Sequence, residues 1–162
     1  MKKNDYHFSY EIYTGAEELN SADSSLLEEA RRICEKAYAP YSQFKVGAVA
    51  LLANGQLVRG TNQENASYPA GTCAEHSLLA TAGTLFPGLP IDAMAISYHS
   101  GHGESNQPCS PCGICRQALH EFELRVGRPI RLILGGLTGP VIVVDKASQL
   151  LPLGFTADML GK

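Results

Sequence analysis

Two helix starts that carry cysteine constrain this sequence more than any other feature. Cys73 stands in Cys73-Ala74-Glu75, at the expected start of one helix, and Cys112 and Cys115 stand in Pro111-Cys112-Gly113-Ile114-Cys115, at the expected start of another. A Cys-x-x-Cys pair in a first helical turn points both sulfurs the same way, and a helix N-terminus stabilises thiolate charge. With the third thiolate from the other helix start, the sequence predicts a zinc site with three sulfur ligands.

A site with three protein ligands is typical of catalytic zinc, because the fourth tetrahedral position stays open for water. Glu75 follows Cys73 by two residues, which places its carboxylate beside that water without binding the metal. A carboxylate in this position can accept a proton and then return it. A ligand-x-Glu motif followed later by Pro-Cys-x-x-Cys is the signature of zinc-dependent deaminases.

A Cys-x-x-Cys pair alone is also typical of redox pairs and of structural zinc sites. Here Cys109 precedes the pair by three residues, so that Cys109, Cys112 and Cys115 with a remote Cys73 imitate an iron–sulfur run or a closed Cys₄ zinc site. A further cysteine and the usual proline after Cys115 are absent, and a cluster leaves the Cys-Ala-Glu motif unexplained. A closed Cys₄ zinc or iron–sulfur binding module is the alternative from a different functional class.

Helix and turn signals divide the first half of the chain. Ser25-x-x-Glu28 is a capping-box pattern, and the apolar residues after it recur at helical spacing up to a stop at Pro40. Cys34 lies on that apolar face, which favours a buried thiol. Residues 46–52 and 57–61 are predicted to pair as a hairpin, with Asn54-Gly55 supplying two positive-φ positions for a tight turn.

Three further strands and two helices are predicted in the second half. The helices are expected from near Cys73 to Gly83 and from Pro111 or Cys112 through Phe122, and the strands at residues 91–98, 130–134 and 141–144. The link of residues 135–139 is too short for a parallel crossover and predicts an antiparallel return. The fold class is therefore α/β: a three-layer α/β/α sandwich with a mixed five-stranded sheet. Residues 1–20 are expected to form an N-terminal extension, either an arm or an extra strand or turn, and residues 21–162 a single domain.

Composition excludes several functional classes. The net charge of −3 is unfavourable for nucleic acid, because a polyphosphate would be repelled. No apolar run is long enough for a membrane span, and residues 1–7 lack the apolar core of a secretory signal, so we expect a cytoplasmic protein. An odd cysteine count of 5 argues against a disulfide framework.

Five motifs resemble one family, the small homotetrameric zinc-dependent cytidine deaminases, over about residues 24–160. They are Tyr38-Ala39-Pro40-Tyr41-Ser42-x-Phe44-x-Val46-Gly47-Ala48, Asn62-x-Glu64-Asn65-Ala66-Ser67-Tyr68, Cys73-Ala74-Glu75, Ser110-Pro111-Cys112-Gly113-x-Cys115-Arg116-Gln117, and Leu150-Leu151-Pro152 with Phe155. The resemblance implies a cytidine deaminase-like fold and one Zn²⁺ per subunit of a homotetramer. It also implies that free cytidine and deoxycytidine are deaminated to uridine and deoxyuridine plus ammonia by a zinc-bound hydroxide, in pyrimidine salvage.

The same resemblance implies roles for individual residues. Cys73, Cys112 and Cys115 would hold the zinc, and Glu75 would protonate N3 of the base and then the departing amine. The implied substrate contacts are Phe44 against the base, Asn62 and Glu64 on the ribose hydroxyls, the backbone of Ala74 at the base carbonyl, and Phe155 reaching a neighbouring subunit's site. Without the resemblance, Phe44 would be interpreted as a core residue, and Asn62 and Glu64 equally well as turn caps. We interpret Tyr68 as structural.

Two departures from the family pattern affect the predicted site. Three thiolates on Zn²⁺ sum to −1, so the site needs positive compensation. Family members usually have arginine directly after Cys-Ala-Glu, whereas this chain has His76. We predict that His76 donates a hydrogen bond to a ligand sulfur and that Arg116 shares the charge compensation.

The second departure is the loop at residues 99–107, which is longer than the family pattern and is followed by an unusual Cys109. A longer loop near the zinc could reshape the space around the exocyclic amine. The alternative substrate is therefore another or an N4-substituted aminopyrimidine nucleoside.

Overall fold

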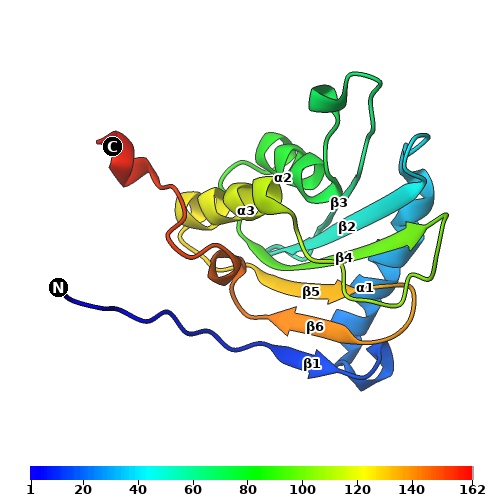
Figure 1. Ribbon diagram of the computed structural model, residues 1–162, viewed down its shortest axis with the longest axis horizontal. Coiled ribbons are helices and arrows are strands. Elements are labelled where there is room, and N and C mark those ends of the chain that lie inside the picture. The colour runs from blue at the N-terminus through cyan, green and yellow to red at the C-terminus, as the bar shows by residue number, and fades with distance from the viewer. Residues whose placement is uncertain (162) are drawn as a thin grey trace.

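The fold is a mixed six-stranded sheet with helices on both faces (Figure 1). The computed structural model describes residues 1–161. The strands run in the order β1-β6-β5-β4-β2-β3 across the sheet. Their bounds are β1 (Glu11–Tyr13), β2 (Phe44–Leu52), β3 (Leu57–Thr61), β4 (Ile91–Ser100), β5 (Arg131–Gly135) and β6 (Val141–Val144), and the helices are α1 (Ser21–Ile33), α2 (Ala74–Leu85) and α3 (Gly113–Val126).

The helices form the two outer layers predicted from the sequence. Helix α1 packs against one face through an apolar core that includes Leu27, Val49 and Ile133. Helices α2 and α3 cover the other face through a second core that includes Leu78 and Leu119. The three-layer α/β/α architecture is confirmed. In the described part of the chain, no helix has the length and apolarity needed to cross a membrane.

The predicted number of five strands was wrong by one. Strand β1 comes from the N-terminal segment and pairs antiparallel with β6, where Ile12 lies opposite Ile142. Residues 1–20 lack the alternation that would separate a strand from an arm or a turn, and β1 forms because β6 offers a free edge. The predicted antiparallel return between β5 and β6 is confirmed, whereas β4 and β5 are parallel and joined through α3.

Helix α1 begins four residues before the predicted capping box. Its N-cap is Asn20, whose side-chain oxygen accepts the N–H of Asp23 at 2.9 Å, and Ser25 lies inside the helix. Both residue types are good N-caps, so the local pattern did not separate them. Tertiary structure favours the earlier start, because Asp23 is buried and paired with Arg131 of β5.

The β2–β3 hairpin forms as predicted, with a different turn. Of its residues only Gly55 has a positive φ, +83°, so the prediction of two positive-φ positions was wrong. The N–H of Gly55 donates to the carbonyl of Leu52 at 2.8 Å, and that of Leu52 donates to Gln56 at 2.9 Å. This pattern is typical of a three-residue hairpin loop that closes with a left-handed glycine. Helix α2 likewise ends at Leu85, two residues beyond the predicted Gly83.

Candidate active site

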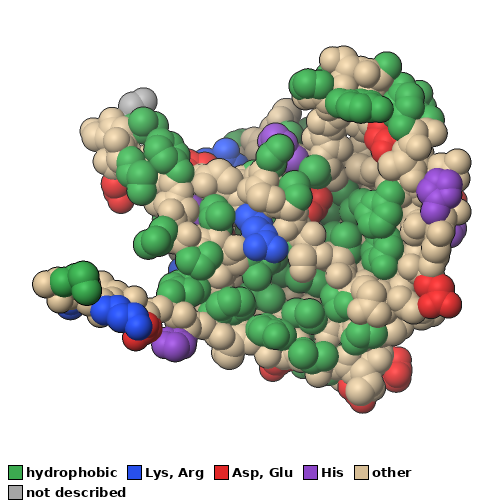
Figure 2. All heavy atoms as spheres, viewed as in Figure 1, with side chains coloured by type: hydrophobic (Ala, Val, Ile, Leu, Met, Phe, Trp, Pro, Cys, Tyr) green, Lys and Arg blue, Asp and Glu red, His purple; other side chains and the backbone are tan. Residues whose placement is uncertain are grey.

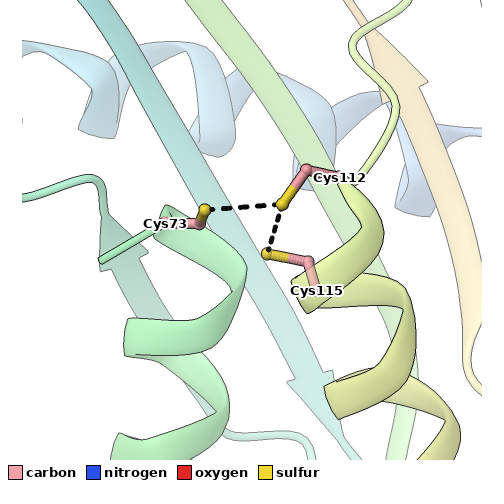
Figure 3. A group of neighbouring side chains, drawn as sticks. All are labelled: Cys73, Cys112 and Cys115. Atoms are coloured by element: carbon pink, nitrogen blue, oxygen red, sulfur yellow. Dashed lines mark hydrogen bonds between the residues drawn. The ribbon is translucent and has the colours of Figure 1, made fainter. Parts of the chain in front are cut away.

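The three predicted sulfur ligands meet where α2 and α3 begin. Cys73 is the N-cap of α2, Cys112 is the N-cap of α3, and Cys115 lies in the first turn of α3. Figure 3 shows the three side chains pointing toward one another from the two helix starts. The Sγ atoms of Cys73 and Cys112 are 3.7 Å apart, as are those of Cys112 and Cys115, and all three lie within 4.8 Å of one another.

These distances fit a tetrahedral zinc ion. With Zn–S bonds of 2.3 Å and tetrahedral angles, the ligand sulfurs of a zinc site stand about 3.8 Å apart. The two helix N-termini also direct their positive ends at the sulfurs, which offsets part of the negative charge of three thiolates. The donor set is therefore suited to Zn²⁺ in both spacing and chemistry.

The thiols differ in acidity when no metal is bound. Burial raises the pKa of Cys73 to about 11, and burial with nearby negative groups raises that of Cys115 further. Burial also acts on Cys112, but the N–H groups of Cys115 and Ile114 and the neighbouring thiols hold its pKa below the usual range. Zinc binding must therefore displace the protons that burial holds on Cys73 and Cys115.

Glu75 lies beside the sulfurs and is 5% exposed. Burial raises its pKa, and the interaction with the Cys115 thiol and the charge of His76 oppose that rise only in part. A raised pKa brings a carboxyl group closer to neutral pH, where it can both accept and donate a proton. Glu75 is therefore buried beside the sulfurs with a raised pKa, and its role as general acid and base stays a prediction.

The first turn of α2 is held against β3 at a glycine. A Cβ atom at Gly60 would stand 2.3 Å from the carbonyl oxygen of Ala74 and 2.6 Å from the backbone nitrogen of Leu78. Only a residue without a side chain allows this approach. Gly60 therefore sets how closely the turn that carries Glu75 packs on the sheet.

A cavity of about 780 Å³ connects Cys73 and Cys112 with most of the predicted substrate contacts. In Figure 2 the segment between β3 and α2 stands out at the upper right, above a hollow in the face. The predicted site residues that line the cavity are Phe44, Asn62, Glu64, Cys73, Ala74, Glu75 and Cys112. The fold therefore brings most of the predicted site together around one space.

The two predicted ribose contacts are fixed by backbone groups of the cavity wall. The side-chain oxygen of Asn62 accepts the N–H of Val46 at 2.7 Å, and its Nδ2 donates to the carbonyl of Phe44 at 2.8 Å. The carboxylate of Glu64 accepts from the hydroxyl of Ser42 and from the N–H of Tyr41, which lowers its pKa. Both side chains are preorganised, and their substrate roles stay predictions.

The other two predicted contacts inside the cavity are Phe44 and Ala74. Phe44 opens β2 and stacks on Tyr98, with ring centroids 4.8 Å apart and an interplanar angle of 20°. Ala74 is fully buried at the first helical position of α2. A backbone N–H at that position has no partner within the helix and can meet an acceptor in the cavity.

Phe155 stands apart from the cavity of its own chain. It is exposed in the segment after η4 (Ala147–Leu150), and its carbonyl accepts a hydrogen bond from Nε2 of Gln117 at 2.9 Å. It does not line the cavity. Its predicted contact with a neighbouring subunit's site stays a prediction.

Cys109 is not a fourth member of the sulfur group. Among residues 1–161 the only cluster with metal-ligand spacing contains Cys73, Cys112 and Cys115. Cys109 lines the cavity instead, and burial raises its pKa to about 12. The closed Cys₄ or iron–sulfur alternative therefore has no support in the geometry.

The two residues predicted to compensate the thiolate charge have other surroundings. His76 is exposed, and within residues 1–161 its imidazole makes no hydrogen bond to a ligand sulfur. The guanidinium of Arg116 donates to the carbonyls of Pro111 at 2.9 Å and Leu150 at 3.1 Å. Arg116 thus joins the segment before Cys112 to the end of η4. A contribution of its charge to the sulfurs stays a prediction.

The loop at residues 99–107 does not line the cavity; only the following Cys109 and Ser110 do. It packs on the β5–β6 link, where the N–H of Thr138 donates to the carbonyl of Ser105 at 3.2 Å. The expectation that this loop reshapes the space around the amine is therefore not supported. Nothing in this loop therefore favours N4-substituted nucleosides over cytidine.

Sequence reasoning missed two aromatic residues of the cavity. Tyr68, interpreted as structural, lies in η3 (Tyr68–Ala70) with its ring exposed at the cavity wall, and Tyr41 stands opposite with ring centroids 6.3 Å apart. Both belonged to the motifs that contain the predicted substrate contacts. Their position in those motifs was the sequence feature that could have identified them as cavity residues.

Comparisons with known proteins agree with this geometry. Residues 20–128 match the family model "Cytidine and deoxycytidylate deaminase zinc-binding region". Two similar proteins are the cytidine deaminases of Halalkalibacterium halodurans, 38% identical over 82% of this chain and 93% of the relative, and of Sporosarcina psychrophila, 34% identical over 83% and 92%. The crystal structure of a cytidine deaminase from Burkholderia pseudomallei superposes with a TM-score of 0.70 at 37% identity, covering 85% of this chain and all of that one.

Proposed function

Because the chain belongs to the cytidine and deoxycytidylate deaminase family, we propose that it hydrolyses free cytidine and deoxycytidine to uridine and deoxyuridine plus ammonia. One observation carries the proposal. Cys73 and Cys112 of the three-thiolate group and the buried Glu75 line one cavity with Phe44, Asn62 and Glu64. One cavity is thus lined by metal ligands, by a carboxylate that can transfer protons, and by aromatic and polar side chains that can contact a nucleoside.

Zinc, when bound by the three thiolates, lowers the pKa of a water molecule. That water can then act as a nucleophile near neutral pH. Glu75 does the proton transfer. It accepts a proton from the attacking water and delivers it to N3 of the base. It then takes the remaining proton from the hydroxyl group formed at C4 and delivers it to the departing amine, which leaves as ammonia. Its raised pKa suits both directions of transfer, because the carboxyl group must be protonated and deprotonated twice in each turnover.

The other residues of the cavity orient the nucleoside. The face of Phe44 packs against the base, and the backbone N–H of Ala74 meets the base carbonyl. The Nδ2 of Asn62 keeps a second N–H after its bond to Phe44, and the carboxylate of Glu64 accepts a ribose hydroxyl. Because backbone hydrogen bonds already fix both side chains, little conformational entropy is lost when the sugar binds.

A free nucleoside fits this chain better than a polynucleotide. The net charge is −3, and a groove for single-stranded nucleic acid is usually lined with cations. The role in the cell would then be pyrimidine salvage. The five cysteines form no disulfide within residues 1–161, so we place the protein in a reducing compartment, the cytoplasm.

We further propose that the enzyme works as a homotetramer. The support is Phe155, an exposed aromatic residue on the C-terminal segment that lies outside the cavity of its own chain. In the tetramer it would close the cavity of a neighbour. Leu153, Met159 and Leu160 of the same segment are exposed as well, and a group of large apolar side chains left in water is typical of an interface.

The test follows the loss of the cytidine absorbance band after addition of the purified zinc protein. Wild type should deaminate cytidine and deoxycytidine. Glu75→Ala should retain one zinc per chain and lose about 10²–10⁴-fold in turnover, because the proton carrier is missing. Glu121→Ala, which removes an exposed carboxylate on α3, should keep full activity. No turnover of either nucleoside by the zinc-loaded wild type would overturn the proposal.

A further inference from the structure

Tyr98 is an aromatic residue next to the cavity that does not line it. It lies on β4, where it faces Val46 of β2 in register, and Phe44 is the next residue of β2 on the same side of the sheet. Side chains at such diagonal positions of an antiparallel pair are within reach when they are aromatic. The neighbouring strands β2 and β4 can be followed in Figure 1.

The rings of Tyr98 and Phe44 form a nearly parallel stack, with centroids 4.8 Å apart and an interplanar angle of 20°. The two residues differ in freedom. Tyr98 is 8% exposed and belongs to the buried part of β4, whereas Phe44 is 37% exposed at the first position of β2. An exposed ring at a strand end has several accessible rotamers unless a neighbour selects one.

We infer that Tyr98 is a positioning residue for the substrate base: its buried ring holds the ring of Phe44 in the orientation that presents a face to the cavity. The inference rests on the proposed function, in which Phe44 packs against the base. Tyr98 itself touches no substrate. It acts by supplying a rigid surface behind Phe44, so that the aromatic wall is formed before the nucleoside arrives.

The kinetic signature follows from where the stack acts. The contact between Phe44 and the base is the same before and during the reaction, so weakening it is a loss of uniform binding. KM should rise while kcat stays constant. The stacking of two aromatic rings contributes a modest free energy beyond that of the apolar area that it buries. Loss of the stack should therefore raise KM by about three- to tenfold.

The experiment compares KM and kcat for cytidine in Tyr98→Leu, Tyr98→Phe and wild type. Leucine keeps an apolar side chain and removes the planar ring, so KM should rise by about three- to tenfold with kcat within about twofold of wild type. Phenylalanine restores the ring and should restore the wild-type KM. The matched control is Tyr13→Leu, which removes a partly buried tyrosine from β1 at the opposite edge of the sheet and should leave KM unchanged.

A double-mutant cycle separates positioning from general damage. In a Phe44→Leu background, Tyr98→Leu should add no further increase in KM, because the ring that it positions is gone. Equal effects of Tyr98→Leu with and without Phe44 would overturn the inference, as would a wild-type KM in Tyr98→Leu. If Tyr98→Leu does not fold, as judged by zinc content and melting temperature, Tyr98→Met gives the same comparison with a more adaptable side chain.

A failure of the proposed function and a failure of the positioning role would give different results. A wild-type protein without activity on cytidine contradicts the proposed reaction itself. An active wild type with uncoupled Tyr98 and Phe44 contradicts only the positioning role.

Discussion

Glu123 is a buried carboxylate on α3 that ties three parts of the fold together. It is 5% exposed, and its Oε1 accepts the N–H of Ile130 at 2.7 Å and that of Ala147 at 3.0 Å. Its Oε2 accepts the N–H of Ser148 at 3.1 Å. The carboxylate of Glu123 therefore joins three segments by hydrogen bonds: the end of α3, the segment that enters β5, and the start of η4.

The cost of removing this anion can be estimated from its bonds. A hydrogen bond to a charged group contributes about 1.5–3 kcal/mol, and a buried N–H left without a partner costs about 1–3 kcal/mol. Because breaking a buried charged network costs about 3–5 kcal/mol in total, we expect Glu123→Ala to lower the free energy of unfolding by about 4 kcal/mol. In a chain of this size that corresponds to a fall in melting temperature of about 8–16 °C.

Glu123→Gln is the finer perturbation. The amide can keep its oxygen toward Ile130 and Ala147, but its NH₂ group then faces the N–H of Ser148, which is also a donor. One bond is lost and one donor pair is opposed, so we expect a loss of about 2 kcal/mol.

The assay is thermal and urea unfolding of the zinc-loaded protein, followed by circular dichroism. Glu121→Ala removes an exposed carboxylate from the same helix and serves as the control, with an expected change within about 0.5 kcal/mol. If Glu123→Ala melts within 2 °C of the control, the three hydrogen bonds do not hold the fold together and the reasoning is wrong.

Three further predictions concern other parts of the molecule. Hydrogen bonds from an arginine of α1 and one of β3 lower the pKa of Glu29, so its ionised form stabilises the fold. The deficit of Glu29→Gln in urea unfolding should be about 0.5–1 kcal/mol above the ordinary carboxyl pKa of 4.5 and should vanish as the pH falls through the lowered pKa. Gly60→Ala should cost about 2 kcal/mol and most of the turnover, because its Cβ collides with the carbonyl of Ala74; unchanged kinetics would contradict the close packing. Cys109→Ser should keep one zinc per chain by metal analysis, whereas loss of the metal would restore the four-ligand alternative.

Local sequence patterns were sufficient to predict the structure where a residue type or a link length has one physical consequence. The Cys-x-x-Cys and Cys-Ala-Glu motifs predicted the sulfur ligands, because a first helical turn directs both side chains regardless of the rest of the fold. The short β5–β6 link predicted an antiparallel pair for the same reason, since its length alone forbids a crossover. The three layers followed from the order of the elements.

Local sequence patterns did not predict the structure where two local conformations have similar free energies. Asn20 and Ser25 are equivalent caps, and the buried pair between Asp23 and Arg131 decided between them. The N-terminal strand depended on the free edge of β6, which lies 128 residues or more away along the chain. Neither contact can be read from a window of ten residues.

The sequence by itself determined the chemistry of this protein: three thiolates and one carboxylate at two helix starts. Only the tertiary structure decided how that chemistry is enclosed. It kept Cys109 out of the sulfur group, moved the loop at residues 99–107 away from the cavity, and placed Tyr98 behind Phe44. The reason is that ligand spacing is a property of one helical turn, whereas a cavity wall is built from strands and loops that meet only when the whole sheet has formed.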